Sequence, residues 1–453
     1  MTEDFETFRD PLLSLFQSAA VDVGKKIDQQ SASRGGPRSQ IASSAKSDLE
    51  AIATSIARRE RGEEDDATPA ARDLSKLGIA RACAEWGLRY LKAVALGNQA
   101  SIVALEDEFT TGTCDPAWLG TLREYRSYFD ASGKRKPIPY IRPAQTGAQV
   151  IEIKADASIG LLADWGTGAR PAVEVLKALA SDQADVLVHL GDIYYSGTPS
   201  ECAQNFLQLM NLVLRQAAAM PVFTLSGNHD MYCGGVGFYD LIKQLNPSPF
   251  TQPASFFCLR SADENWQLLA MDTGLHDDNP SGIADALTYL EDDELEWHCD
   301  RIREFPGRTI LLSHHPLFSA FSAIGAPGAD GKRTAVNPKL LTAFERLSAE
   351  KAIAAWFWGH EHNLAIYNPF AGLARGRCVG HGAVPVSVLD QIYEPVGDLG
   401  DTPTIIPGTE LGKGPGVYNH GYAMLAFRGK ACRAEYFEVA GGKKNLIFGE
   451  DFE

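Results

Sequence analysis

The chain lacks the features that mark secreted and membrane proteins. Its eight cysteines are scattered without a Cys-x-x-Cys pair, and every Asn-x-Ser/Thr triplet has proline at its centre, so no acceptor for N-linked glycosylation is present. The first residues, Met-Thr-Glu-Asp-Phe-Glu, are acidic where a signal peptide would be basic and then apolar, and no apolar run reaches the length of a membrane span. We therefore expect a cytoplasmic protein with reduced, mostly buried thiols and no membrane partner.

Positive charge is also scarce. The formal net charge is -16 and no long run of lysine and arginine offsets it, which argues against a nucleic acid as the main partner. A small anionic substrate would therefore need local positive charge, and bound metal ions could supply it. Hydrophobic residues at 45% and charged residues at 22% are ordinary for a folded protein, and 453 residues favour two domains.

Residues 1–140 are expected to form an N-terminal helical region with flexible linkers. Apolar residues recur at helical spacing from Phe5 to Ala19, and further helices are expected at residues 48–59, 73–96 and 116–128, with polar linkers at 29–44 and 62–71. No chemical motif occurs in this region. We therefore favour a packing or homo-oligomerisation role over a regulatory or ligand-sensing module, although composition alone does not separate the two.

A basic, proline-containing connection at residues 133–139 precedes a second domain, expected at residues 141–453. Beyond about residue 148, strand-like apolar runs alternate with helical segments, which is typical of an α/β fold. Helices are expected at about residues 171–180, 201–218, 285–304 and 338–350, the last with Asn337 as its N-cap. After His362 the pattern changes to strands and glycine turns, which favours a pair of mixed sheets flanked by helices.

Polar residues of the types that bind metals follow five apolar runs. The runs 159–163, 186–190, 221–226, 309–313 and 354–358 have strand character and precede, in order, Asp164, Asp192, Asn228, His314 and His360. Open α/β sheets gather their ligands at the carboxyl edge of the strands, and carboxylate, amide and imidazole groups bind metals. The five strand ends are therefore expected to converge on one metal site.

Five short blocks carry a resemblance to a known family. Asp164-Trp165-Gly166, Gly191-Asp192-x-x-Tyr195, Gly227-Asn228-His229-Asp230, His314 and Gly359-His360-x-His362 together resemble the signature of calcineurin-like metallophosphoesterases. Each block alone is a weak signal, whereas all five in order, each after an apolar run, are a strong one. The resemblance covers about residues 151–439. It implies a two-sheet β-sandwich flanked by helices, with a dinuclear metal centre between the loops at one edge.

One departure from the usual signature points to a branch of the family. Most members have a histidine two residues after the first aspartate, whereas this chain has Gly166 there and Tyr195 three residues after Asp192. That combination resembles the purple acid phosphatases, in which the tyrosine binds a ferric ion; a packing tyrosine is the alternative. A phenolate in place of a neutral imidazole adds one negative charge, which a trivalent ion balances. The resemblance therefore implies Fe³⁺ together with Fe²⁺, Mn²⁺ or Zn²⁺.

Carried over residue by residue, the resemblance implies two ligand sets bridged by one aspartate. One metal ion would be held by Asp164, Asp192, Tyr195 and His362, and the other by Asp192, Asn228, His314 and His360. Of the adjacent His314 and His315, we choose His314 because the family's ligand lies two residues before the proline.

The resemblance also implies catalytic residues. His229 matches the family position that contacts the phosphate or protonates the leaving group, and Asp230 is expected to orient its imidazole. His381 and His420 are weaker candidates for contacts with the substrate. The implied reaction is in-line attack on phosphorus by a metal-activated hydroxide.

The sequence thus favours a hydrolase of small phosphoric esters, either a phosphomonoesterase or a phosphodiesterase. The loops 274–284 and 317–336, the second with Lys332 and Arg333, are expected to decide which, because pocket shape rather than metal chemistry separates the two substrate classes. The alternative is a metal-stabilised, non-catalytic scaffold whose helical N-terminus recruits a partner. The complete ligand set counts against it.

Overall fold

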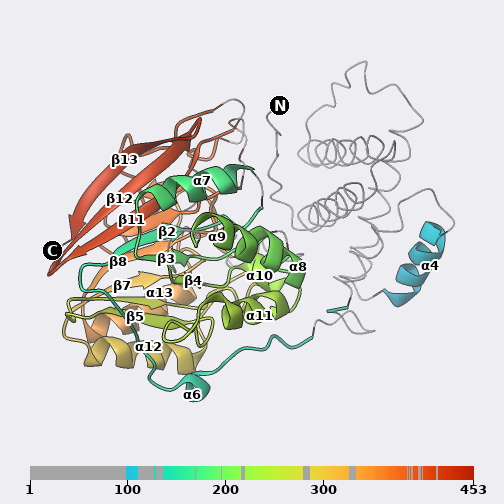
Figure 1. Cartoon of the computed structure of the whole chain (residues 1–453), viewed down its shortest axis with the longest axis horizontal. Helices are drawn as coiled ribbons and strands as arrows, with labels where there is room; N and C mark the ends of the chain where they lie inside the picture. The colour runs from blue at the N-terminus through green and yellow to red at the C-terminus, as the bar shows by residue number, and fades with distance from the viewer. Residues whose placement is uncertain are drawn as a thin grey trace. The chain divides into compact units, whose positions relative to one another are not determined.

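The computed structural model of the chain describes residues 98–110, 127–128, 136–168, 170–194, 196–215, 220–278, 286–325, 333–384, 386, 388, 391–395, 399, 401–414 and 417–452. The chain divides into two compact units, residues 1–137 and 138–453, whereas the sequence placed the boundary after residue 140. The described part of the first unit includes the helix α4 (Gln99–Thr110) (Figure 1). The helices expected at 5–19, 48–59 and 73–96, and nearly all of that at 116–128, lie outside the described residues.

The second unit is built on two mixed β-sheets, as the sequence predicted. Within the described residues the strand orders are β1-β5-β6-β7-β8-β10-β9 in one sheet and β13-β12-β11-β2-β3-β4 in the other. The first sheet comprises β1 (Ile151–Ile153), β5 (Phe257–Ser261), β6 (Trp266–Ala270), β7 (Arg308–Leu312), β8 (Ile353–Trp358), β9 (Leu364–Ile366) and β10 (Gly376–Val379). The second comprises β2 (Ser158–Leu162), β3 (Val186–His189), β4 (Val222–Thr224), β11 (His420–Arg428), β12 (Ala431–Ala440) and β13 (Lys443–Phe452).

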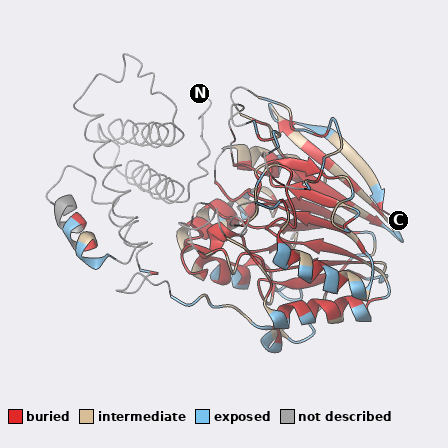
Figure 2. Ribbon diagram, turned by 180° about the vertical axis from the view of Figure 1, so that it is seen from behind, coloured by how far each residue is buried: buried red, intermediate tan, exposed pale blue. Residues whose placement is uncertain are grey.

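The two sheets face each other across one apolar core. Alternate residues of a strand point to opposite faces, so Ile159 and Leu161 of β2 reach the same buried cluster as Ile310 and Leu312 of β7. Figure 2 shows buried residues running along both sheets. Burying each such side chain contributes about 1.5–3 kcal/mol to the stability of the fold, so the apolar face of a strand turns inward.

Helices cover the two outward faces (Figure 1). The apolar residues of α7 (Arg170–Ser181) and α9 (Gln208–Val213) pack against the six-stranded sheet of the described chain, and those of α12 (Asp292–Glu304) and α13 (Pro338–Glu350) pack against the other sheet. The side chain of Asn337 accepts the backbone N–H groups of Lys339 and Leu340, which confirms the expected N-cap. The other described helical segments are α6 (Pro143–Thr146), α8 (Pro199–Glu201), the π-helical turn η2 (Cys202–Leu207), α10 (Asn228–Met231) and α11 (Val236–Leu245).

Parallel pairing places the expected site residues at the ends of neighbouring strands. β2, β3 and β4 run parallel in one sheet, and β6, β7 and β8 run parallel in the other. The five apolar runs predicted to be strands correspond to β2, β3, β4, β7 and β8. Parallel strands end at the same edge of a sheet, so the loops that follow them are brought together.

A buried ion pair ties the two sheets together through side chains. Arg377 of β10 donates to both carboxylate oxygens of Glu450 in β13, at 2.6 and 2.8 Å, and to the carbonyl oxygen of Tyr367 at 2.8 Å. The hydroxyl of Tyr436 donates to the same carboxylate at 2.8 Å. Arg377 is only 2% exposed, so these additional hydrogen bonds are needed to offset the cost of removing the two charges from water.

The six cysteines in the described part of the chain are buried and free, as the composition led us to expect. They are Cys202, Cys233, Cys258, Cys299, Cys378 and Cys432. None of the helices that the structure describes combines the length and the apolar character needed to cross a membrane.

Candidate metal centre

Loops that follow five strands bring the expected side chains together. Asp164 follows β2, Asp192 follows β3, Asn228 opens α10 after β4, His314 follows β7, and His360 and His362 follow β8. Asp164, Asp192 and His314 are at most 1% exposed, whereas the side chain of His362 is 23% exposed. The centre is therefore enclosed by the protein on the side of the two aspartates and accessible near His362.

A first cluster of polar groups surrounds the hydroxyl of Tyr194. This oxygen lies 2.8 Å from Asp164 Oδ1, 3.1 Å from Asp192 Oδ2 and 3.0 Å from His362 Nε2. Asp164 Oδ1 and His362 Nε2 are 3.5 Å apart. The cluster thus brings together two carboxylates, an imidazole and a phenol, which are groups of the kinds that bind metal ions.

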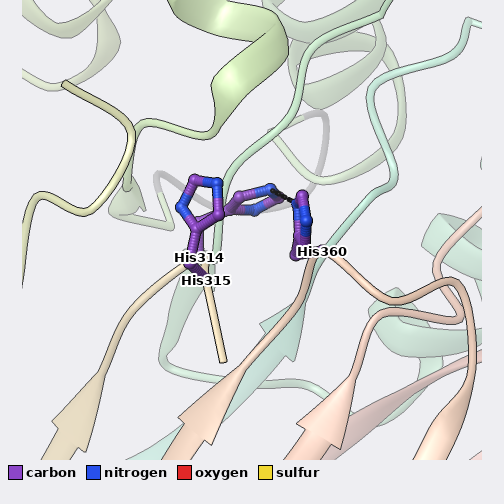
Figure 3. A group of neighbouring side chains, drawn as sticks. All are labelled: His314, His315 and His360. Atoms are coloured by element: carbon purple, nitrogen blue, oxygen red, sulfur yellow. Dashed lines mark hydrogen bonds between the residues drawn. The ribbon is translucent and has the colours of Figure 1, made fainter. Parts of the chain in front are cut away.

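A second cluster shares Asp192 with the first. Asn228 Oδ1 lies 3.1 Å from both His314 Nε2 and His360 Nδ1, and these two nitrogens are 3.3 Å apart (Figure 3). Asp192 Oδ2 is 3.4 Å from His314 Nε2. Donor atoms that bind an ion at about 2.0–2.2 Å lie about 3.0–3.5 Å from one another, so this spacing fits a metal site.

The imidazole of His314 is oriented to bind a cation. Its Nδ1 lies 2.9 Å from the carbonyl oxygen of Leu190, so in the neutral ring Nδ1 carries the hydrogen and the lone pair of Nε2 points into the cluster. Burial opposes a charge on this ring, but Asp192 and Asp164 outweigh it and raise the pKa of His314 to about 9. Without a cation, a proton on His314 compensates the carboxylates. Metal binding would displace that proton.

Tyr194, rather than Tyr195, lies in the described cluster. The family spacing pointed to Tyr195, which lies outside the described residues, so its expected role as a ligand stays a prediction. The only sequence signal for Tyr194 is the doubled tyrosine in Gly-Asp-Ile-Tyr-Tyr. Burial and the carboxylates of Asp164 and Asp192 raise the pKa of Tyr194 well above its ordinary value, so its hydroxyl keeps its proton unless a cation is close.

Three site residues have an unfavourable backbone conformation. Asp164, Asp192 and His360 have φ angles of 53°, 74° and 68°, in the left-handed region that L-residues other than glycine rarely adopt. Neighbouring glycines make room for these turns: a Cβ at Gly227 would collide with Asp192 Oδ1, and one at Gly359 would lie 2.6 Å from Asp164 Oδ2. Such tight turns are a common feature of functional sites because they direct side chains to one point.

His229 lies beside the shared carboxylate. Its backbone N–H donates to Asp192 Oδ1 at 3.0 Å, and its Nε2 lies 4.0 Å from Asp192 Oδ2. Its ring contacts those of Tyr194 and Tyr232, with ring centroids 4.6 and 4.8 Å away. At 8% exposure, His229 is positioned to reach a molecule bound over Asp192 without belonging to either cluster.

Asp230 joins two of the site loops. Its Oδ2 accepts the backbone N–H groups of Gly227 at 2.8 Å and Asp192 at 3.0 Å, and its Oδ1 accepts that of Ile193 at 3.2 Å. This role in fixing the backbone of Asp192 was not evident from the sequence. The orientation of the His229 imidazole by Asp230 stays a prediction.

His315 lies next to the second cluster but has hydrogen-bond partners of its own. Its ring forms a group with those of His314 and His360 (Figure 3). However, its Nδ1 lies 3.1 Å from Thr273 Oγ1 and its Nε2 lies 3.3 Å from Asp277 Oδ2. Both of these partners lie outside the two donor clusters, whereas Nε2 of His314 faces Asn228 and Asp192 inside the second cluster, so the geometry favours His314 over His315 as the ligand.

The other expected contacts are less well defined by the structure. Nε2 of His381 lies 3.1 Å from the carbonyl oxygen of Phe437, and burial lowers the pKa of His381 to about 4, so this ring is a neutral hydrogen-bond donor. Contact of His381 or His420 with a substrate stays a prediction. Of the two residues noted in the second substrate loop, Lys332 lies outside the described residues and Arg333 is exposed.

Residues 157–364 match the family model of calcineurin-like phosphoesterases. Among solved structures, the chain is similar to GAP50, the anchor in the inner membrane complex of Plasmodium, at 13% identity over 66% of this chain and 89% of that one, with a TM-score of 0.41. It is similar to PhoD at 10% identity over 70% and 71% of the two chains, with a TM-score of 0.45. It is also similar to a dimetal phosphatase from Danio rerio at 13% identity over 65% and 99%, with a TM-score of 0.38. No curated protein matches the chain.

Proposed function

We propose that this chain, whose residues 157–364 match the calcineurin-like phosphoesterases, a family of metal-dependent phosphoester hydrolases, is a dinuclear hydrolase of small phosphoric esters. The observation that supports two ions rather than one is the pair of donor clusters that share Asp192. A carboxylate common to two clusters can hold two cations close together. We assign one ion to Asp164, Asp192, Tyr194 and His362, and the other to Asp192, Asn228, His314 and His360.

Two bound cations would supply the Lewis acidity that activates water and polarises the phosphoryl oxygens. The chain's own residues would provide orientation and a proton. The amide of Asn228 is fixed in orientation because its Nδ2 donates to the hydroxyl of Tyr232 at 2.6 Å. Its Oδ1 therefore faces the two imidazoles. His229, beside Asp192, would hold a proton on Nε2 and transfer it to the leaving oxygen.

A hydrolysis assay with defined metals tests this proposal. Purified protein, stripped with a chelator and reloaded with iron, manganese or zinc, should hydrolyse a chromogenic phosphate monoester, a phosphate bis-ester, or both. The stripped protein should be inactive. The relative rates with the two substrates assign mono- or diester preference. A metal-loaded protein that hydrolyses neither ester would favour the alternative of a non-catalytic scaffold.

The ferric assignment is a separate proposal, and it predicts a colour. A trivalent cation next to Tyr194 would stabilise the phenolate, despite the burial that otherwise raises the pKa of this residue. Iron-loaded protein should then have a visible phenolate-to-iron charge-transfer band. Because the Tyr194 hydroxyl lies 2.8 Å from Asp164 Oδ1 and 3.0 Å from His362 Nε2, Tyr194→Phe should abolish the band. The adjacent Tyr195→Phe is the comparison, and on this assignment it should leave the band in place.

Absorption spectra of the two iron-loaded variants measure this difference. Loss of the band in Tyr195→Phe alone would restore the assignment made from the family spacing. A colourless, active enzyme containing only divalent ions would exclude a ferric site.

A further inference from the structure

A row of four polar residues runs from the metal-centre loops to the segment at which the second unit begins. The row, which we call the Asp272 relay, comprises Ser226 before α10, Asp272 after β6, Glu294 in α12, and Tyr140. Ser226, Asp272 and Glu294 are at most 1% exposed. None of the four belongs to the ligand set assigned above.

At one end, Asp272 holds the loop that carries Asn228 and His229. Its Oδ1 accepts the hydroxyl of Ser226 at 2.6 Å and the backbone N–H groups of Gly274 and Leu275 at 3.1 and 3.0 Å. The turn lies so close to the loop that a Cβ at Gly274 would be 2.7 Å from the carbonyl oxygen of Gly227. A shift of Asp272 would therefore be passed on to the residues directly before Asn228.

At the other end, the relay reaches residues 138–142, which we call the connecting segment. The backbone N–H of Asp272 donates to Glu294 Oε1 at 2.9 Å, and the hydroxyl of Tyr140 donates to Glu294 Oε2 at 2.8 Å. On the same segment, Ile138 and Ile141 pack against the cluster of Met231, Phe238, Tyr239 and Ile242. Met231, the last residue of the helix that begins at Asn228, belongs to the cluster against which the connecting segment packs.

Each bond of the relay matters because its surroundings exclude water. Hydrogen bonds to buried carboxylates are stronger than those in water, and a buried group that loses its partner is destabilised. Removing the Tyr140 hydroxyl leaves Glu294 Oε2 short of a donor. The carboxyl group of Glu294 is then held through Oε1 alone, by the Asp272 backbone N–H and by His298 Nε2 at 3.3 Å. A change in its position disturbs the bond to the Asp272 backbone and, through Asp272 Oδ1, the bond to Ser226.

We propose that Tyr140 and Asp272 are positioning residues for the metal centre, through which the connecting segment sets the placement of Asn228 and His229. The effect that we expect on turnover rests on the proposed function. Its first readout is metal affinity, which is measured without a substrate.

Tyr140→Phe in the full-length chain tests the proposal at the end far from the metals. Mn²⁺ binding, followed by titration calorimetry, should weaken roughly 3- to 10-fold, less than the 10- to 100-fold typical when a direct partner of a metal ligand is removed. Turnover should fall with it. The midpoint of thermal unfolding, measured without metal, should fall by only a few degrees, since one buried acceptor loses its donor.

Trp297→Phe is the matched control. It removes a hydrogen bond of the same kind, from Trp297 Nε1 in α12 to the carbonyl oxygen of Gly147 at 2.8 Å, just beyond the connecting segment and outside the relay. Its metal affinity should equal that of wild type. Equal effects of Tyr140→Phe and Trp297→Phe on Mn²⁺ binding would overturn the proposal, as would a Tyr140→Phe variant that only unfolds at lower temperature.

Asp272 offers a conservative pair of variants. Asp272→Asn keeps the oxygen that accepts from Ser226, Gly274 and Leu275 and replaces only the second carboxylate oxygen by an amide of similar size. Asp272→Asn should therefore retain most of the Mn²⁺ affinity, whereas Asp272→Leu should lose it. Equal affinities in the two variants would contradict the relay.

A double-mutant cycle tests whether the two ends are coupled. The effects of Tyr140→Phe and Ser226→Ala on Mn²⁺ affinity should combine to less than their product, because both act on one network. Strictly multiplicative effects would overturn the coupling. Wild-type protein that binds Mn²⁺ in this way but hydrolyses no ester would refute the proposed function alone, and one that binds no metal would refute both.

Discussion

Asp192→Asn should abolish metal binding and ester hydrolysis together. A single oxygen of Asp192 faces both donor clusters: its Oδ2 lies 3.1 Å from the Tyr194 hydroxyl and 3.4 Å from His314 Nε2. Asparagine has nearly the same shape, so the fold should persist, but it has one oxygen fewer and no charge. The loss of affinity should exceed the roughly 100-fold upper value for partners of metal ligands, since Asp192 is assigned as a ligand to both ions.

The prediction is checked by measuring bound metal and turnover in the same preparation. Asp300→Asn on α12 is the matched control, because it makes the same chemical change at an exposed carboxylate paired with Arg303. That variant should bind metal and turn over like wild type. If Asp192→Asn kept two tightly bound ions, the shared-carboxylate assignment would be wrong even if activity were lost.

His229→Asn should separate catalysis from metal binding. Turnover should fall by roughly 10²- to 10⁴-fold, the range for loss of a general acid, while both ions remain bound. The reason is geometric: the backbone N–H of His229 holds Asp192 in any variant, whereas the side chain lies outside both donor clusters. The substitution thus removes a proton source without removing a ligand.

Leaving groups of different basicity distinguish this role from substrate binding. A leaving oxygen that is already a weak base needs little protonation, so the loss in kcat should be small for a nitrophenyl ester and large for an alkyl ester. Asp300→Asn, which changes an exposed carboxylate on α12 outside both substrate loops, is the control and should leave the ratio of the two rates unaltered. An equal loss with both esters would assign His229 to substrate binding instead.

The sequence predicted several strands because they are local apolar runs, whereas the two-sheet sandwich was implied by the family resemblance. β2, β3, β4, β7 and β8 follow from uninterrupted buried positions, and the order of the motifs follows from the order of those strands. β13 was not anticipated, since its pattern, exposed over its first four residues and only partly buried over the next four, gives no clear period-two signal. Its place is set by pairing with β12, a contact that no local pattern encodes.

The metal centre likewise contains residues that local sequence could predict and residues that it could not. The polar residues that follow the strands were predictable because the end of an apolar run marks the end of a strand, and therefore the edge of the sheet at which the next residues lie. Tyr194 was not predicted, because the family spacing pointed to the next residue and no local pattern distinguishes two adjacent tyrosines. The relay through Asp272 was missed for a related reason: its members are distant in sequence and are linked only by hydrogen bonds in the folded chain.

The left-handed turns at Asp164, Asp192 and His360 lower the stability of the fold while they place functional side chains. Each non-glycine residue held in that conformation costs on the order of 1 kcal/mol, and a whole domain is stable by only about 5–15 kcal/mol. Glycine at any of the three positions would relax the backbone and remove the very group that the turn presents. These three residues therefore cost stability that glycine would not cost, as is expected where a strained backbone presents a side chain for function.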